Sequence, residues 1–187
     1  MNNLAAKFGI ASLALGASLL SVPALAEERV CRGTIGATTL DNVRVPQGAT
    51  CVLNGTRVKG TITVQTNARL FASGVVVIGN VQGENARNVV VDDGSRVGGS
   101  VQVVQGLAAT VADSRIDGSI QTESNDQAIR VLRNRVGSDV QAFQNTGGVQ
   151  ISRNVIDGNL QCKENRPRPT GGGNVVQGNK EDQCAGL

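Results

Sequence analysis

Four arginines recur at one position of a repeated segment of this chain, and such a row can bind an anionic ligand. They are Arg57, Arg96, Arg115 and Arg135, with Val76 interrupting the series. If the segments stack as parallel strands, neighbouring guanidinium groups lie about 4.8 Å apart and can form bidentate bonds with carboxylates or sulfates of an extended anionic polysaccharide. The alternative is that these are solvated positions partly neutralised by nearby acids, because exposed ion pairs contribute little free energy.

A second polar series consists mainly of amides. Its members are Thr63, Gln82, Gln102, Gln121, Gln141 and Gln161. Stacked amides can hydrogen-bond to one another along the stacking axis, as they do in cross-β assemblies. We therefore interpret this series as structural, with sugar binding as the alternative, and we interpret Asn134, Asn154 and Asn174 at one bend in the same way.

Residues that could support catalysis are few. Asp93, Asp113, Asp117 and Arg115 are the only group close enough in the repeat to act together, as acids and a base do in polysaccharide lyases and hydrolases. Catalysis would also require a shielded cleft that shifts their pKa values, and no long insertion interrupts the repeat to build one. The chain has no His for a triad or a zinc site and no phosphate loop. We expect no catalytic residues, no metal site and no cofactor.

The repeat itself is a string of glycine or serine, a small polar residue, an apolar residue and a second polar residue. Six copies begin at Gly60, Gly79, Gly99, Gly118, Ser138 and Gly158. The apolar member advances by roughly twenty residues from each copy to the next. A partial copy at Asn174–Asn179 follows Asn154–Asn159 at the same interval. So steady a period indicates stacked structural units.

Two further apolar columns accompany the string. Four residues before its apolar member stand Val58, Val77, Val97, Ile116, Val136 and Ile156, and nine or ten before it stand Val52, Phe71, Val91, Val111, Val131 and Ile151. We expect both columns to point inward. Polar residues alternate with them at period two, which indicates strands, and Gly, Asn, Asp and Ser mark the bends. A unit of this length buries its apolar face only by stacking, so the sequence predicts an all-β fold, a single parallel β-helix of about seven rungs of roughly twenty residues.

The chain resembles the right-handed parallel β-helix superfamily, the pectate-lyase-like fold, in three features. They are the rung length, the order of apolar, polar, bend and glycine positions, and the stack of Asn134, Asn154 and Asn174. The resemblance covers about residues 40–180 and fits a small exported bacterial member. It implies a right-handed coil and is not specific to any activity. The chain also loosely resembles bactofilins, which assemble end to end but face the cytoplasm and lack a cleaved signal.

Residues 1–26 have the form of a secretory signal. A start with one basic side chain, Lys7, precedes an apolar run and ends in Ala24-Leu25-Ala26, so we expect cleavage after Ala26 and a mature domain of residues 27–187. Cleavage removes one of the 18 basic residues and none of the 15 acidic ones, which leaves a formal charge of +2. That charge is too small to predict bulk attraction to nucleic acid or to membranes. We expect a periplasmic or extracellular protein that is not inserted in a membrane.

The four cysteines, Cys31, Cys51, Cys162 and Cys184, form an even set in an exported chain, which favours disulfides over metal binding. Three connectivities are possible. Residues one rung apart lie about 4.8 Å from each other, within the Cα separation that a disulfide needs. Because the first two and the last two cysteines are each separated by about one rung, the sequence predicts the pairs Cys31–Cys51 and Cys162–Cys184, each joining a terminal rung to its neighbour.

Together these patterns favour an exported, non-enzymatic protein with a structural or surface-binding role in the cell envelope or outside the cell. An anionic polysaccharide or another envelope component is the expected partner. The alternatives are an anionic-polysaccharide-binding module that uses the four arginines, and a minimal polysaccharide lyase or hydrolase.

Overall fold

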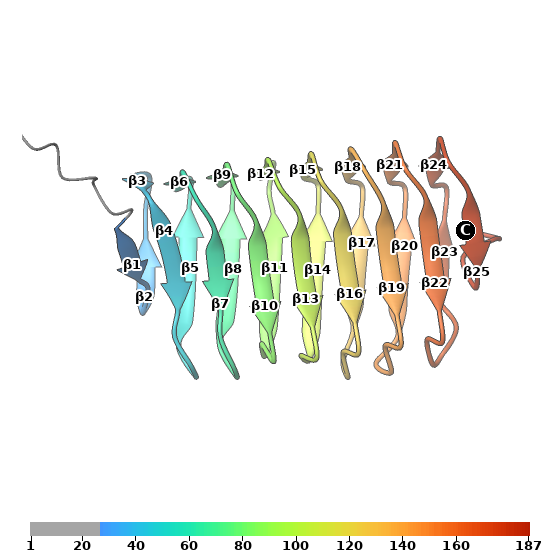
Figure 1. The fold of residues 1–187 in the computed structure, drawn as a ribbon, viewed down its shortest axis with the longest axis horizontal. Helices are drawn as coiled ribbons and strands as arrows, with labels where there is room; N and C mark the ends of the chain where they lie inside the picture. Colours follow the sequence, from blue (N-terminus) through green and yellow to red (C-terminus); the bar gives the residue numbers. More distant parts are fainter. Residues whose placement is uncertain (1–26) are drawn as a thin grey trace, which may run out of the picture.

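The computed structural model describes residues 27–187, and the expected signal segment lies outside them. They form a parallel β-solenoid in which each rung contributes a strand to each of three sheets, A, B and C (Figure 1). There are eight rungs and a last strand, one rung more than the sequence predicted. The difference arises because two rungs, over residues 28–58, precede the first copy of the repeated string at Gly60, and the partial copy at Asn174–Asn179 ends the eighth rung and leads to the last strand.

All three sheets are parallel, and each strand pairs with the equivalent strand of the next rung. Sheet A contains β1 (Glu28–Val30), β4 (Asn42–Val45), β7 (Ile62–Val64), β10 (Val81–Glu84), β13 (Val101–Val104), β16 (Ile120–Glu123), β19 (Val140–Phe143), β22 (Leu160–Lys163) and β25 (Lys180–Asp182). Sheet B contains β2 (Gly33–Ile35), β5 (Thr50–Asn54), β8 (Arg69–Ser73), β11 (Asn88–Asp92), β14 (Ala108–Ala112), β17 (Ile129–Leu132), β20 (Val149–Ser152) and β23 (Thr170–Gly172). Sheet C contains the short strands β3 (Thr39–Leu40), β6 (Arg57–Val58), β9 (Val76–Val77), β12 (Arg96–Val97), β15 (Arg115–Ile116), β18 (Arg135–Val136), β21 (Val155–Ile156) and β24 (Val175–Val176). Within residues 27–187, no helix is long and apolar enough to cross a membrane.

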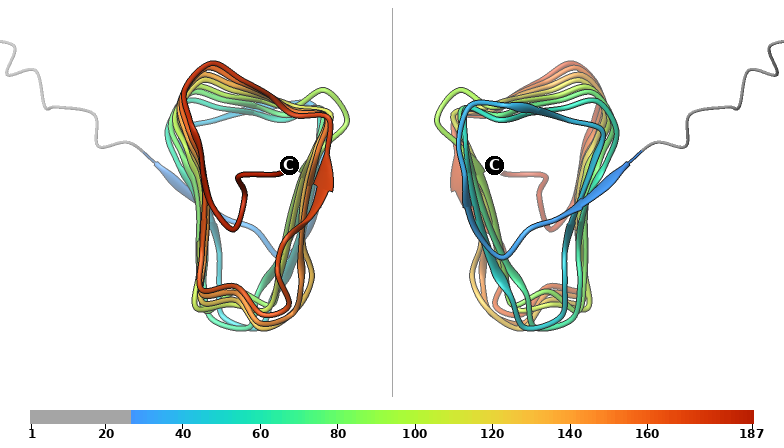
Figure 2. Two further views of the ribbon diagram at one scale, coloured as in Figure 1. Left: turned by 90° about the vertical axis from the view of Figure 1, so that its right-hand side faces the viewer. Right: turned by 90° about the vertical axis from the view of Figure 1, so that its left-hand side faces the viewer.

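The core runs along the axis inside the three sheets, where successive rungs superimpose in Figure 2. The apolar member of the repeated string and the column four residues before it are buried in every copy, as predicted. The column on sheet B was predicted wrongly at two places, because Val52 and Phe71 are half-buried and face outward while Leu53 and Ala72 point inward.

The error has a simple geometric origin. The inward residue of sheet B lies nine positions before the apolar anchor in these rungs, and ten positions before it only at Val91, because the bend after β11 contains an extra residue at Asp93-Gly94. Since side chains alternate between the two faces of a strand, a one-residue miscount moves a side chain to the opposite face.

At the corner between sheets C and A, a polar side chain in each rung bonds the backbone of the next rung. Asn42 Oδ1 accepts a hydrogen bond from the Thr61 N–H at 2.9 Å, and Asn80 Oδ1 accepts one from the Ser100 N–H at 2.8 Å. The same contact recurs at Thr61, Ser100, Ser119, Asp139 and Asn159. The small polar residue of the repeated string is therefore selected by its ability to bond an adjacent rung.

Buried asparagines connect the rungs at the other two corners. As predicted, Asn134, Asn154 and Asn174 stack, and the Asn134 Nδ2 donates to Asn154 Oδ1 at 3.1 Å and to the Val111 carbonyl at 2.7 Å. A second ladder of Asn125, Asn145 and Asn165 ends on Gln183 and was not predicted, although its asparagines have the same one-rung spacing. No buried side-chain polar atom in residues 27–187 lacks a hydrogen-bond partner.

Both predicted disulfides are present. Cys31 is joined to Cys51 with their Cα atoms 5.5 Å apart, and Cys162 is joined to Cys184 with a Cα separation of 5.2 Å. The chain crosses the two open ends of the solenoid at these places, and Leu187 packs against the core (Figure 2). Two disulfides are typical of proteins in an oxidising compartment.

The unpredicted asparagine ladder gives the first testable expectation. Asn145→Ala removes the acceptor of the Asn125 N–H and Nδ2 and the side-chain donor to the Thr122 carbonyl, and the buried Asn125 N–H is then left without its partner. An unsatisfied buried group costs about 1–3 kcal/mol, so we expect the free energy of unfolding to fall by about 2–3 kcal/mol. Equilibrium denaturation measures the change. Gln144→Asn, at the exposed neighbouring position, is the control, and equal losses in the two variants would contradict the assigned role of the ladder.

Candidate functional site

The structure aligns the predicted arginines in one column of sheet C. Arg96, Arg115 and Arg135 occupy equivalent places in the adjacent strands β12, β15 and β18, whereas Arg57 on β6 is separated from them by Val76 on β9. All four side chains are exposed. The chain thus presents three consecutive guanidinium groups and one outlying group on its narrowest sheet.

Acidic residues lie among these arginines. Arg115 Nε donates to Asp117 Oδ1 at 2.8 Å, and the Arg135 guanidinium lies 3.9 Å from Asp157 Oδ2. Within the described residues, Arg57 and Arg96 form no ion pair. The column is therefore a mixture of paired and unpaired arginines, and half of its charge is balanced by the protein itself.

The acids considered for catalysis are not gathered around a common point. Asp113 accepts two hydrogen bonds of 2.6 Å, from Nε and from a terminal nitrogen of Arg133, while Asp117 bonds Arg115 on sheet C. The hydrogen bond from Arg133, reinforced by its charge, lowers the pKa of Asp113. A catalytic acid that works near neutral pH needs the opposite shift. The geometry and the pKa direction both disfavour Asp113 as a general acid.

Arg133 was not predicted as a partner of Asp113, although its spacing in the sequence indicates the pairing. Asp113, Arg133 and Arg153 lie one rung apart at the bend after sheet B, and each has a positive φ of 49–56°. All three side chains are exposed, so opposite charges in one column of the bend can meet.

The glutamine series forms an unbroken hydrogen-bonded ladder on sheet A. The Nε2 of Gln82 donates to Gln102 Oε1 at 3.1 Å, and the next three links, of 2.6, 3.0 and 2.8 Å, run through Gln121 and Gln141 to Gln161. Gln161 Nε2 donates to Glu181 Oε2 at 2.8 Å. This confirms the predicted stacking of the amides and adds Glu181, on β25, as an unpredicted end group.

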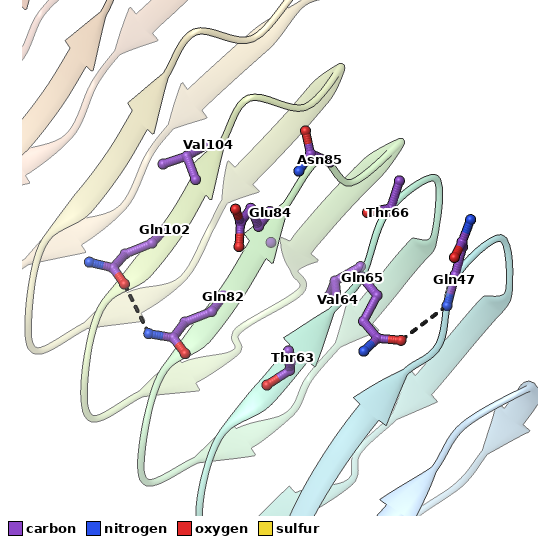
Figure 3. Close-up of a pocket in the computed structure, with 11 residues that line it drawn as sticks. Gln47, Thr63, Val64, Gln65, Thr66, Gln82, Glu84, Asn85, Gln102 and Val104 are labelled. Atoms are coloured by element: carbon purple, nitrogen blue, oxygen red, sulfur yellow. Dashed lines mark hydrogen bonds between the residues drawn. The ribbon is translucent and has the colours of Figure 1, made fainter.

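An open hollow lies at the other end of the ladder (Figure 3). It separates two outward columns of sheet A and has a volume of about 650 Å³. Thr63, Gln82 and Gln102 line one side, and Gln65 and Glu84 line the other. Gln65 Oε1 accepts a hydrogen bond from the Gln47 N–H at 3.2 Å, which fixes the side chain nearest the bend. The hollow was not predicted, and one of its lining residues, Thr63, has a shorter side chain than the glutamines at this position in later rungs.

The Asp113–Arg133 pair gives a prediction for acid pH. Because the folded pKa of Asp113 is lowered from its ordinary value of 3.8, the pair stabilises the fold above pH 3.8, and its contribution is lost as the pH falls below that value and through the folded pKa. Carboxyl-detected NMR titration should give a midpoint below 3.8 in the unaltered protein and a midpoint close to 3.8 in Arg133→Gln. Arg115→Gln, which removes a different ion pair, should leave the Asp113 midpoint unchanged. A midpoint that does not move in Arg133→Gln would exclude this pair as the cause of the shift.

No three side chains among the Cys, Asp and Glu residues of the described range gather where they could hold a metal ion. Comparisons of the chain with protein-family models, with curated proteins and with solved structures found no match. The structure therefore establishes a parallel β-solenoid with two disulfides. Membership of the pectate-lyase-like superfamily remains an expectation from the rung pattern.

Proposed function

We propose that this chain is an exported, non-enzymatic β-helix protein with a structural or surface-binding role in the cell envelope or outside the cell. The observation that carries the proposal is that the regular polar columns bond mainly to themselves. The glutamine ladder and the two asparagine ladders use their side chains to join one rung to the next. Such columns stiffen a solenoid and leave few polar groups free for chemistry.

The arrangement of the acids supports the absence of catalysis. Asp113 and Asp117 each bond an arginine, and both carboxylates are about half exposed to solvent. A general acid or base of a glycosidase needs a partner carboxylate across a shielded cleft. These two acids lie on an open surface, and each is bonded to an arginine instead of a partner carboxylate.

The two disulfides support a role that depends on persistence of the fold. Each joins residues of neighbouring rungs at one end, and cross-links that close loops of about twenty residues stabilise a protein by roughly 3 kcal/mol. The ends of a solenoid have unpaired strand edges and are where it opens first. A disulfide between each terminal rung and its neighbour therefore helps to keep the lateral faces intact outside the cell.

The test of the main proposal is incubation of the oxidised mature protein with a panel of neutral and anionic polysaccharides. We expect no new reducing or unsaturated chain ends over many hours, at protein concentrations that saturate any binding. Steady turnover of any polymer that is lost in Asp113→Asn or Asp117→Asn would contradict the proposal and favour a minimal lyase or hydrolase.

A second function, anionic-polysaccharide binding, is favoured by one specific observation. Arg96, Arg115 and Arg135 stand on three consecutive strands, so their guanidinium groups repeat along the axis of an extended ligand. Arg96 forms no ion pair in the described part of the chain, and the 3.9 Å contact of Arg135 is too long for a strong hydrogen bond. A polyanion could therefore compete for these groups at low cost.

Retention on an immobilised sulfated or uronate polymer tests this second function. The variant with Arg96, Arg115 and Arg135 all changed to Gln should bind roughly tenfold more weakly, because each exposed contact contributes about 0.2–1 kcal/mol, and its binding should depend less on salt. Arg57→Gln alone, one rung beyond Val76, is the matched control and should lose little. Unchanged binding and salt dependence when all four arginines are replaced would exclude the arginine column as the binding site.

A further inference from the structure

We propose that the hollow at the N-terminal end of the glutamine ladder binds the ammonium group of an amino-sugar chain. The inference rests on the proposed function only in treating this face as a binding surface and not as a catalytic one. It uses three observations: the direction of the ladder, the charge of the hollow and the chemistry of its walls.

The ladder has a fixed direction. Glu181 is a carboxylate and can only accept, so Gln161 must use its Nε2 as the donor to it, and its Oε1 is left to accept from Gln141. The same reasoning applies at each link up to Gln82, whose Nε2 donates to Gln102. The Oε1 of Gln82 is therefore the terminal acceptor, and among the hydrogen bonds of the described residues none reaches it.

The direction also strengthens that acceptor. In a chain of aligned hydrogen bonds each amide polarises the next, and here the chain begins on a full negative charge at Glu181. Electron density is displaced from rung to rung toward Gln82. The end of the ladder in the hollow therefore attracts a strong hydrogen-bond donor, and an ammonium group is such a donor with a charge of the matching sign.

The hollow has an excess of negative charge and of acceptors. Glu84 contributes an exposed carboxylate, and among residues 27–187 no Lys or Arg lines the hollow (Figure 3). The nearest basic residue in the ladder column is Arg44, opposite Thr63 in the preceding rung, and its Nε donates to Glu28 at 2.7 Å. Its charge is thus engaged outside the hollow. Hydroxyl groups of Thr63 and Thr66 add further oxygens to the walls.

The walls favour a saccharide over a lysine-bearing peptide. One common way for a peptide to bind a β-protein is to add a strand at a free sheet edge, but β7 and β10, which carry this hollow, are paired with a strand on both sides. The exposed walls consist mostly of amides and hydroxyls, which are natural partners for sugar hydroxyls, with Val104 as an apolar contact. The volume of about 650 Å³ is typical of small-ligand sites, which span about 300–1,000 Å³.

The first experiment compares two oligomers that differ only at nitrogen. A glucosamine tetramer at mildly acidic pH carries ammonium groups, and the N-acetylglucosamine tetramer carries neutral amides in the same places. We expect the first to bind and to shift the NMR side-chain amide signals of Gln82 and Gln102, and the second to bind at least tenfold more weakly. Equal binding of the two, or binding of neither, would overturn the proposal, and so would tighter binding of a lysine-containing peptide of the same charge.

Variants locate the site and separate it from a general surface effect. Thr63→Gln adds one more amide to the ladder, which can donate to Gln82 Oε1 and fill the hollow while keeping a side chain that the column accepts in five later rungs. Glu84→Gln removes the charge at nearly constant shape. Each should weaken binding of the glucosamine tetramer by roughly tenfold or more, the loss expected for one hydrogen bond to a charged group.

Glu123→Gln is the matched control, because Glu123 lies in the same outward column as Glu84 but two rungs away and outside the hollow. It should bind like the unaltered protein. Wild-type affinity in both Thr63→Gln and Glu84→Gln would overturn the assigned site. Shortening of the oligomers during the assay would contradict the non-enzymatic function instead, and the variants would still decide whether the hollow binds the ligand.

Discussion

Each residue of this solenoid must be compatible with the residue about one rung away, because the two are stacked in adjacent parallel strands. The backbone hydrogen bonds between rungs hold equivalent positions about 4.8 Å apart, which is close to the contact distance of side chains. At the corner before sheet A the fit is tighter still, and a methyl group on Gly79 would lie 2.7 Å from the Gly60 carbonyl oxygen. The preceding rung thus favours glycine at the start of the repeated string, although Ser138 occupies this position in one copy.

Because of the same constraint, equivalent residues of successive rungs form a column, and every residue of a column must be compatible with its neighbours above and below. Buried polar residues meet this requirement by hydrogen-bonding to the equivalent residues of adjacent rungs, as Asn154 does with both Asn134 and Asn174. Exposed amides do the same on sheet A. Within such a polar column the side chains satisfy one another's hydrogen-bonding groups. The groups that can still bind a ligand lie where the repeated residue is replaced by another. In the glutamine ladder the repeat fails at Thr63, and that is the place where the hollow opens.

The fold is predictable from the sequence because the inward residues recur with so steady a period. The disulfide partners are predictable for the same reason, since one rung of chain brings Cys31 beside Cys51. The errors on Val52 and Phe71 arise where a bend in another rung gains a residue, and period-two alternation turns that single insertion into a reversed face. The local amino-acid composition does not reveal the inserted residue.

The candidate site was less predictable, because the partner of each arginine depends on how far side chains reach between columns. Asp113 bonds Arg133 in its own column of the bend, although Arg115 is nearer in sequence. Likewise, the stacking of the glutamines is evident from their spacing, whereas the direction of the ladder is not.

The two ends of the solenoid are closed by disulfide-linked segments, whereas its lateral faces are open. Disulfide-linked segments cross both ends of the solenoid, so assembly by axial stacking, as in bactofilin-like filaments, would have to displace them (Figure 2). The lateral faces remain, and they differ in charge: sheet C presents arginines, whereas sheet A presents amides, with a carboxylate and a terminal acceptor at the hollow. Local geometry of this kind would allow the two proposed binding faces to discriminate between ligands of opposite sign, although the formal charge of the whole chain is only +3 and produces no strong net field.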